Sequence, residues 1–276
     1  MKNKIFNWLV IVTLVVVSHQ VSANIAGWTT IGTSGVSSAI DGVVTIPSPN
    51  TSVNWISTAG GVFGNNGGYV GTNGSTVTSN AFAVTSAGTD LTFAFDFVTS
   101  DGTTLFPDYA WANLYKADDN SLVATLFTAT TNPTGSAVPG TGKGLPAISA
   151  TITPATVTVT TGGGSTKWSP LGGSSDACYQ GYGQGCGNTD WVDALYNIAS
   201  PGSYYLTFGV ANARDQAFDT GMAFVGTAIG GVPIEDEDVS VPEPTTIVLM
   251  AIGLAALAVR RRSLISSADM PGVLRL

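Results

Sequence analysis

The chain has 276 residues, of which 10% are charged and 44% hydrophobic, with 34 glycines and a formal net charge of −8. This composition excludes a charge-driven disordered chain and predicts many tight turns. Between Asn24 and Ser240 there are four basic and sixteen acidic residues, a net of −12. Such a body repels phosphate backbones, which excludes nucleic acid as an expected partner.

Residues 1–23 have the pattern of a secretory signal peptide. Lys2 and Lys4 precede an apolar run from Ile5 to Val17, and Val21-Ser22-Ala23 supplies the small residues that signal peptidase requires. The run is shorter than the roughly 20 residues of a membrane span, although an uncleaved anchor is the alternative. We therefore expect export, with signal peptidase as a partner.

The inventory of side chains limits the chemistry of the exported part. The only histidine, His19, lies in the leader, and every acidic residue from Asn24 to Ile234 is an aspartate. Without histidine there is no Ser-His-Asp or Cys-His catalysis and no histidine-ligated zinc. We expect a protein that is not an enzyme.

Residues 24–234 read as strands joined by glycine-rich turns. In Leu91–Phe97, for example, one leucine and three phenylalanines alternate with other residues and fall on one face of a strand. This pattern predicts an all-β ectodomain, a jelly-roll-like β-sandwich of two sheets. The expected strands are Val43–Ile46, Val53–Ile56, Ala81–Thr85, Leu91–Thr99, Tyr109–Lys116, Leu122–Thr128, Ile148–Thr160, Tyr204–Ala211 and Met222–Ile229, with loops at Gly60–Gly74, Asn132–Gly144 and Gly162–Gly173.

Two parts of the body share a motif in which a strand leads into an aspartate turn, a phenylalanine, an aspartate and a second strand. If both are hairpins side by side in one sheet, Asp101, Asp108, Asp215 and Asp219 meet at one rim. Aspartate favours turns because its side chain bonds nearby backbone N–H groups. The alternative is a calcium site assembled from separate loops, since carboxylate oxygens are calcium ligands.

Cys178 and Cys186 bound a short segment that contains three glycines. Outside the cytoplasm these cysteines can oxidise, so we expect a disulfide, with two buried free thiols as the alternative. A ring of this size restricts only the local chain, by about 2 kcal/mol. The disulfide is therefore expected to shape a loop and not to hold the fold.

Asp190 and Asp193 flank Trp191, which could stack on a sugar. Glycoside cleavage needs two carboxyl groups about 5–5.5 Å or 6.5–9.5 Å apart. We favour a structural interpretation, with Trp191 packed beneath the disulfide loop. The other tryptophans of the body discussed here are expected in the core or at seams: Trp28, Trp55, Trp111 and Trp168.

The C-terminal region has three parts: an acidic linker with prolines at 235–244, an apolar segment at 245–259, and residues 260–276, which open with Arg260-Arg261-Arg262. Proline starts but does not continue a helix, so Pro242 and Pro244 precede one. A helix over residues 245–259 is about 22 Å long, short of the roughly 30 Å hydrocarbon core. The arginines mark the cytoplasmic side.

Pro242-Glu243-Pro244, the apolar segment and the arginine cluster together resemble the PEP-CTERM sorting signal of exopolysaccharide-producing Gram-negative bacteria. The body is also similar to PEP-CTERM ectodomains at Val98–Gly102, Phe106–Trp111 and Trp168–Gly173. The resemblance implies a β-sandwich, and an exosortase-type membrane protease that recognises Pro-Glu-Pro and removes the tail. Most such signals end at the basic cluster, whereas this chain continues to Leu276.

Two functions fit these observations. The first is a non-enzymatic exported protein, anchored transiently in the inner membrane and then sorted to the cell envelope or extracellular matrix. Its role would be structural or adhesive, with exopolysaccharide as a possible partner and calcium as a possible cofactor. The second is a carbohydrate-binding or glycan-cleaving module.

Overall fold

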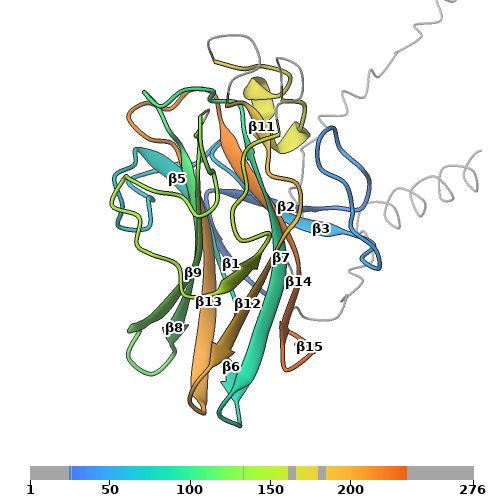
Figure 1. The fold of residues 1–276 in the computed structure, drawn as a ribbon, viewed down its shortest axis with the longest axis vertical. Helices are drawn as coiled ribbons and strands as arrows, with labels where there is room; N and C mark the ends of the chain where they lie inside the picture. The colour runs from blue at the N-terminus through green and yellow to red at the C-terminus, as the bar shows by residue number, and fades with distance from the viewer. Residues whose placement is uncertain (1–24, 26, 133, 161–165, 180–184, 235–276) are drawn as a thin grey trace, which may run out of the picture. The chain divides into compact units, whose positions relative to one another are not determined.

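The computed structural model describes residues 25, 27–132, 134–160, 166–179 and 185–234 (Figure 1). The chain divides into two units, residues 1–235 and 236–276, and the strands belong to the first. The expected signal peptide, the linker at 235–244, the apolar segment at 245–259 and the basic cluster and tail at 260–276 lie outside the described residues. Within those described ranges, no helix is both long and apolar enough to cross a membrane.

Two antiparallel sheets form the fold, which confirms the predicted all-β sandwich. The first sheet has the order β1 (Thr29–Ile31), β5 (Asn73–Thr78), β13 (Gly202–Ala211), β8 (Tyr109–Lys116) and β9 (Leu122–Thr130), with β4 (Val62–Phe63) beside β5 and β6 (Phe82–Val84) beside β13. The second has the order β10 (Thr151–Thr153), β12 (Val192–Ile198), β7 (Thr89–Thr99), β14 (Thr220–Ile229), β3 (Val53–Ser57) and β2 (Thr33–Ser37), with β11 (Gly187–Asn188) beside β7 and β15 (Val232–Pro233) beside β14.

The main core lies between the sheets and is rich in phenylalanine. Residues two apart on a strand share a face, so the alternate residues of β7 from Leu91 to Phe97 all point inward and are buried. Phe95 of β7 stacks on Phe127 of β9 with ring centroids 3.8 Å apart, and Phe208 of β13 stacks on Phe224 of β14 at 4.4 Å. These ring pairs join one sheet to the other.

The two motifs that share aspartates are not hairpins in one sheet, and that prediction is wrong. β7 and β14 belong to the second sheet, whereas β8 and β13 belong to the first. The connections at residues 100–108 and 212–219 therefore cross between the sheets. They lie side by side because Thr99 pairs with Thr220 and Tyr109 pairs with Ala211. Tight hairpins use loops of two to five residues, so connections of this length are free to change sheets.

Smaller clusters cover the outer faces of the sheets. On the second sheet, Trp168 and Leu171 at the short 3₁₀ helix Ser169–Ser174 pack with Val98 and Val225. On the first, Trp111 packs with Tyr109 and Ala211. Three of the tryptophans named above are thus buried, as expected, and Trp55 packs beside the Trp168 cluster.

Several strands differ from the sequence prediction. The segment at 43–46 forms only an isolated bridge between Asp41 and Val44, and the long strand predicted at Ile148–Thr160 shortens to β10. Prolines and glycines explain part of this, since Pro154 directly follows β10 and cannot donate a ladder hydrogen bond. Strands β1, β2, β5 and β12 were missed, and β5 is rich in small polar residues that carry little strand signal.

Gly209 tests the packing on the outer face of the first sheet. A Cβ at this position would lie 2.1 Å from the ring of Trp111, which is 1% exposed. We expect Gly209→Ala to lower the free energy of unfolding by about 1–3 kcal/mol, because a well-packed ring has no room to move. Gly173→Ala is the control, since no heavy atom lies within 4 Å of its Cβ position. Urea denaturation measures both, and equal effects would contradict the packing argument.

Candidate functional site

The two sheet-crossing connections meet at one end of the sandwich, called here the crossover end and defined by residues 100–108 and 212–219. Asp108 joins them, because its Oδ1 accepts a hydrogen bond from the backbone N–H of Ala213 at 2.9 Å. Its Oδ2 is 2.7 Å from Oγ1 of Thr220. The side chain is completely buried, so it acts as an internal cross-link.

Asp108 also ends a chain of buried threonine hydroxyl groups. Oγ1 of Thr220 is also 2.9 Å from Oγ1 of Thr99, and one hydroxyl proton cannot serve both contacts. Burial and the nearby Asp101 carboxyl raise the pKa of Asp108 well above its usual range. Thr220 donates to Oδ2 of Asp108, and the hydroxyl of Thr99 can donate to Thr220 in turn.

The other three aspartates of the motif make separate local contacts. Asp101 accepts from the N–H of Thr103 at 3.1 Å, and Asp215 accepts from the N–H of Ala217 at 3.1 Å. These are the turn contacts that the sequence suggested. Asp219 accepts from Oγ1 of Thr58 at 3.0 Å and from Oγ of Ser174 at 2.8 Å, which ties the second connection to β3 and to the 3₁₀ helix.

The four aspartates lie at the crossover end, as expected, but they do not converge on one point. In the described part of the chain, no three acidic, histidine or cysteine side chains are placed to share a metal ion. Asp101, Asp108 and Asp215 are close enough to interact electrostatically, whereas the Asp219 carboxylate is bonded to hydroxyl groups elsewhere. Calcium binding at Asp101, Asp108, Asp215 and Asp219 stays a prediction.

The disulfide segment packs on the same end. Cys178 and Cys186 are bonded, which confirms the predicted pairing. The N–H of Tyr179 donates to the carbonyl of Ser100 at 2.9 Å. The Tyr179 ring contacts Phe106 and Phe218, the two phenylalanines of the shared motif, at centroid distances of 5.6 and 5.1 Å. The two connections and the disulfide segment, which are distant in sequence, are thereby held together.

Another buried acid, Asp96 in β7, was missed by the sequence reasoning, which singled out Asp101 and Asp108. Asp96 alternates with the inward-pointing phenylalanines and so lies on the outer face of the second sheet. Other residues cover it there, and its exposed fraction is only 1%. Nδ2 of Asn188 donates to Asp96 at 2.9 Å and Oγ1 of Thr189 donates at 3.3 Å. Burial raises the pKa of Asp96 to about 7 despite these bonds. The sequence did contain a signal for this buried acid, because Asp96 stands between two phenylalanines of an apolar strand.

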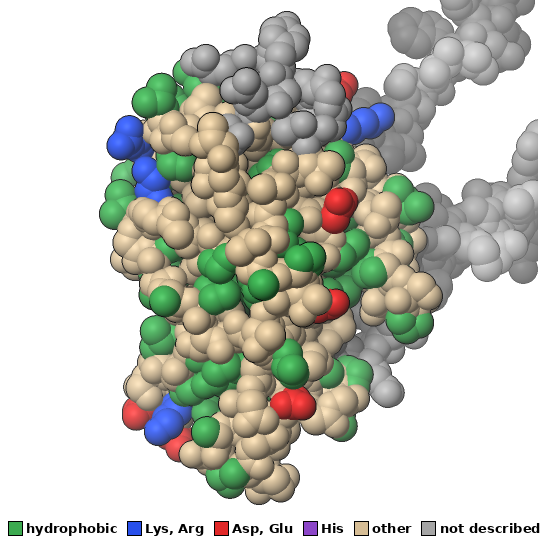
Figure 2. Space-filling view, in the orientation of Figure 1, with side chains coloured by type: hydrophobic (Ala, Val, Ile, Leu, Met, Phe, Trp, Pro, Cys, Tyr) green, Lys and Arg blue, Asp and Glu red, His purple; other side chains and the backbone are tan. Residues whose placement is uncertain are grey.

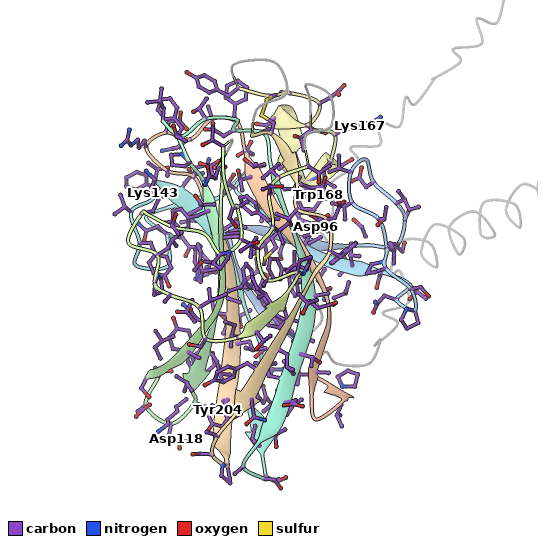
Figure 3. All side chains as sticks on the ribbon, in the orientation of Figure 1. Asp96, Asp118, Lys143, Lys167, Trp168 and Tyr204 are labelled. Carbon is purple, nitrogen blue, oxygen red and sulfur yellow. A yellow bond between two sulfur atoms is a disulfide. The ribbon has the colours of Figure 1, made fainter. Side chains whose placement is uncertain are left out.

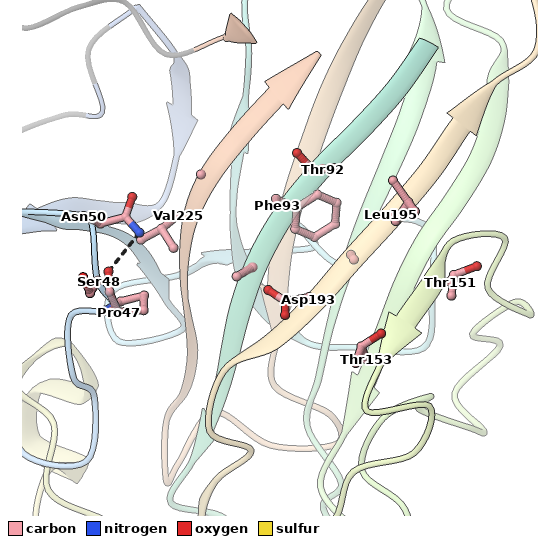
Figure 4. Close-up of a pocket in the computed structure, with 13 residues that line it drawn as sticks. Pro47, Ser48, Asn50, Thr92, Phe93, Thr151, Thr153, Asp193, Leu195 and Val225 are labelled. Carbon is pink, nitrogen blue, oxygen red and sulfur yellow. Dashed lines mark hydrogen bonds between the residues drawn. The ribbon is translucent and has the colours of Figure 1, made fainter. Parts of the chain in front are cut away.

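A groove of about 410 Å³ lies on the outer face of the second sheet (Figure 4). Its floor includes Asp193, which pairs in register with Ala94 of β7 and Thr153 of β10. One wall is the segment 47–50, where Nδ2 of Asn50 donates to the carbonyl of Pro47 at 3.0 Å. The lining combines threonine hydroxyls, one exposed carboxylate and little aromatic surface.

Asp190 does not line this groove with Asp193. It occupies an exposed turn with φ 54°, and its Oδ1 accepts from Nδ2 of Asn188 at 3.2 Å. Trp191 between them donates its Nε1–H to the carbonyl of Thr45 at 3.0 Å and packs against the Trp168 cluster. The tryptophan therefore has a structural role on the outer face of the second sheet.

Comparison with known proteins identifies the C-terminal region. Residues 240–262 match the family described as PEP-CTERM protein-sorting motif. No curated protein matches the chain. Among solved structures, the enzymatically active domain of tailspike protein 4 from bacteriophage CBA120 is 9% identical, with a TM-score of 0.34. The match covers 75% of this chain but only 20% of that chain, and a likeness this low carries no argument.

The buried acids make stability depend on pH. Asp96 has a pKa of about 7 in the folded chain against about 3.9 when unfolded, so between these values only the folded chain keeps the proton. Its contribution is fully present below about pH 4 and is lost as the pH rises through 7. We expect Asp96→Asn to reduce the fall in unfolding free energy between pH 4 and pH 8 by up to about 4 kcal/mol.

The control for this measurement is Asp118→Asn, which changes an exposed carboxylate. Urea denaturation across the pH range should show the wild-type slope for this variant. A wild-type slope for Asp96→Asn as well would mean that Asp96 is ionised throughout.

Proposed function

We propose that the chain is an exported, non-enzymatic protein of the cell envelope or extracellular matrix with a structural or adhesive role. The observation that carries this proposal is the sorting motif at residues 240–262, which implies export, transient membrane anchoring and processing by exosortase, a membrane protease. The final location, removal of residues 1–23 by signal peptidase, and contact with exopolysaccharide are parts of the proposal.

The use of the acidic side chains supports a non-enzymatic role. Asp96 and Asp108 are buried and bonded to neighbouring side chains or backbone groups, and Asp219 is bonded to two hydroxyl groups. General acid–base chemistry needs a titrating group within reach of a substrate. These aspartates instead connect parts of the scaffold, and the exported part has no histidine to replace them.

Processing of the tail tests the proposal. We expect the mature protein in the envelope or secreted fraction to lack residues 1–23 and the sequence that follows the Pro-Glu-Pro motif. Glu243→Ala should preserve the tail, because it alters the recognition motif. Glu237→Ala, an acidic residue outside the matched range, should be processed normally. Intact-mass measurement separates the forms, and native protein recovered from cytosol with both ends intact would exclude the proposal.

A carbohydrate-binding or glycan-cleaving module is the second candidate, and the groove that contains Asp193 favours it. Hydroxyl and carboxylate groups can bind the hydroxyl groups of a sugar, and the groove is open to solvent along the sheet. Cleavage would require a second carboxyl group besides Asp193. Asp190 is the nearest acidic residue in sequence, but it does not line the groove.

A polysaccharide screen with the mature protein distinguishes these functions. We expect no release of reducing ends from any polymer, with wild type and with Asp193→Asn alike. Release of reducing ends that Asp193→Asn or Asp190→Asn abolishes would show a glycosidase. Binding without release that Asp193→Asn weakens would place a sugar in the groove.

A further inference from the structure

Two of the four cations between residues 25 and 234 lie together at the crossover end. The segment 70–72 connects them: the N–H of Val70 donates to the carbonyl of Lys143 at 2.9 Å, and Oγ1 of Thr72 donates to the carbonyl of Asp215, next to Arg214. Figure 2 shows two basic groups close to each other on this side, and Figure 3 labels Lys143 there. Residues 25–234 carry twelve aspartates and four cations, a net of −8, so this pair is a local concentration of positive charge.

Both cations have an unusual backbone. Lys143 has φ 56° and Arg214 has φ 75°, in the left-handed region that long side chains seldom occupy. Lys143 stands between two glycines with φ 81° and 76°, so three consecutive residues are left-handed. Such conformations concentrate at functional sites, because the surrounding structure must hold them in place.

In the described part of the chain, no direct ion pair offsets the charge of Lys143 or Arg214. Asp108 lies nearby but is buried, and burial raises its pKa, which favours the neutral acid. Burial first and the neighbouring Arg214 second lower the pKa of Lys143, and the partial opposing effect of Asp108 does not offset them. An anionic ligand would supply the missing charge.

Lys143 also lines a polar hollow of about 270 Å³. Exposed hydroxyl groups of Thr104 and Thr141 stand in its lining. A second hollow of about 430 Å³ shares Thr141 with the first and is mainly apolar, with Leu145 and Pro146 in its wall. The two hollows are neighbours that share Thr141 and Gly142, and together they are called here the crossover groove, with a cationic, hydroxyl-lined part and an apolar part.

We propose that the crossover groove binds a carboxylated saccharide, with a uronate carboxylate held by Lys143 in the groove and attracted by Arg214 beside it, outside the lining of the two hollows. Thr104 and Thr141 would bond the sugar hydroxyl groups, and the apolar hollow would take the non-polar face of the next unit. This site deepens the adhesive role proposed above and names the class of its ligand.

The acidity of the body makes this recognition specific. Residues 24–240, with a net charge of −12, repel polyanions in general, so any attraction has to come from the local pair. The hydroxyl lining distinguishes a saccharide from an acidic peptide, which offers carboxylates but few hydroxyl groups. A neutral glucan offers hydroxyl groups but no charge for Lys143 and Arg214.

Titration calorimetry of the mature protein tests the site with oligogalacturonate, neutral dextran of the same length and polyglutamate. We expect binding to oligogalacturonate alone. Lys143→Gln and Arg214→Gln should each raise its Kd about tenfold or more, since each removes a charge-assisted bond. Lys116→Gln and Lys167→Gln remove the other two cations of the body and should change the Kd less than about twofold.

A second measurement uses the wild-type protein and does not depend on the folding of a variant. Bound oligogalacturonate should slow chemical acetylation of Lys143 and leave that of Lys116 unchanged, as read by peptide mass spectrometry. The proposal is overturned if oligogalacturonate does not bind, if polyglutamate binds equally well, or if Lys143 is not protected. Processing of the tail is read from the intact mass, so failure of this site leaves the sorting proposal standing.

Discussion

The buried carboxyl group of Asp108 holds the two sheets together at the crossover end. It contacts Ala213 and Thr220 on the other connection, and its backbone carbonyl accepts bonds from Oγ1 of Thr130 and the N–H of Thr131 at 2.9 and 2.8 Å. These contacts fix where both connections lie. The positions of Tyr179 and the disulfide segment, and of Arg214 beside Lys143, follow from them.

This arrangement gives neutral buried acids a structural use. A buried carboxylate without a counter-ion is costly, but a protonated carboxyl group both donates and accepts hydrogen bonds. Asp108 accepts hydrogen bonds from Oγ1 of Thr220 and from the N–H of Ala213, and burial raises its pKa well above the usual range.

Two separate parts of the chain bear on its function. The C-terminal motif determines that the protein is exported and sorted, because a short apolar segment between prolines and arginines suits a transient anchor. The ectodomain is what is delivered there, a β-sandwich with grooves on different elements.

The sequence by itself determined the β-sandwich class, most of the long strands, the disulfide and the sorting motif, because strand alternation and the PEP-CTERM pattern are local signals. Only the tertiary structure decided that the shared motifs cross between sheets, since pairing is a long-range choice that a strand's own residues do not encode. The same holds for the burial of Asp96 and for the meeting of Lys143 with Arg214. Residues about 70 positions apart become neighbours only when strands far apart in the chain close the sandwich.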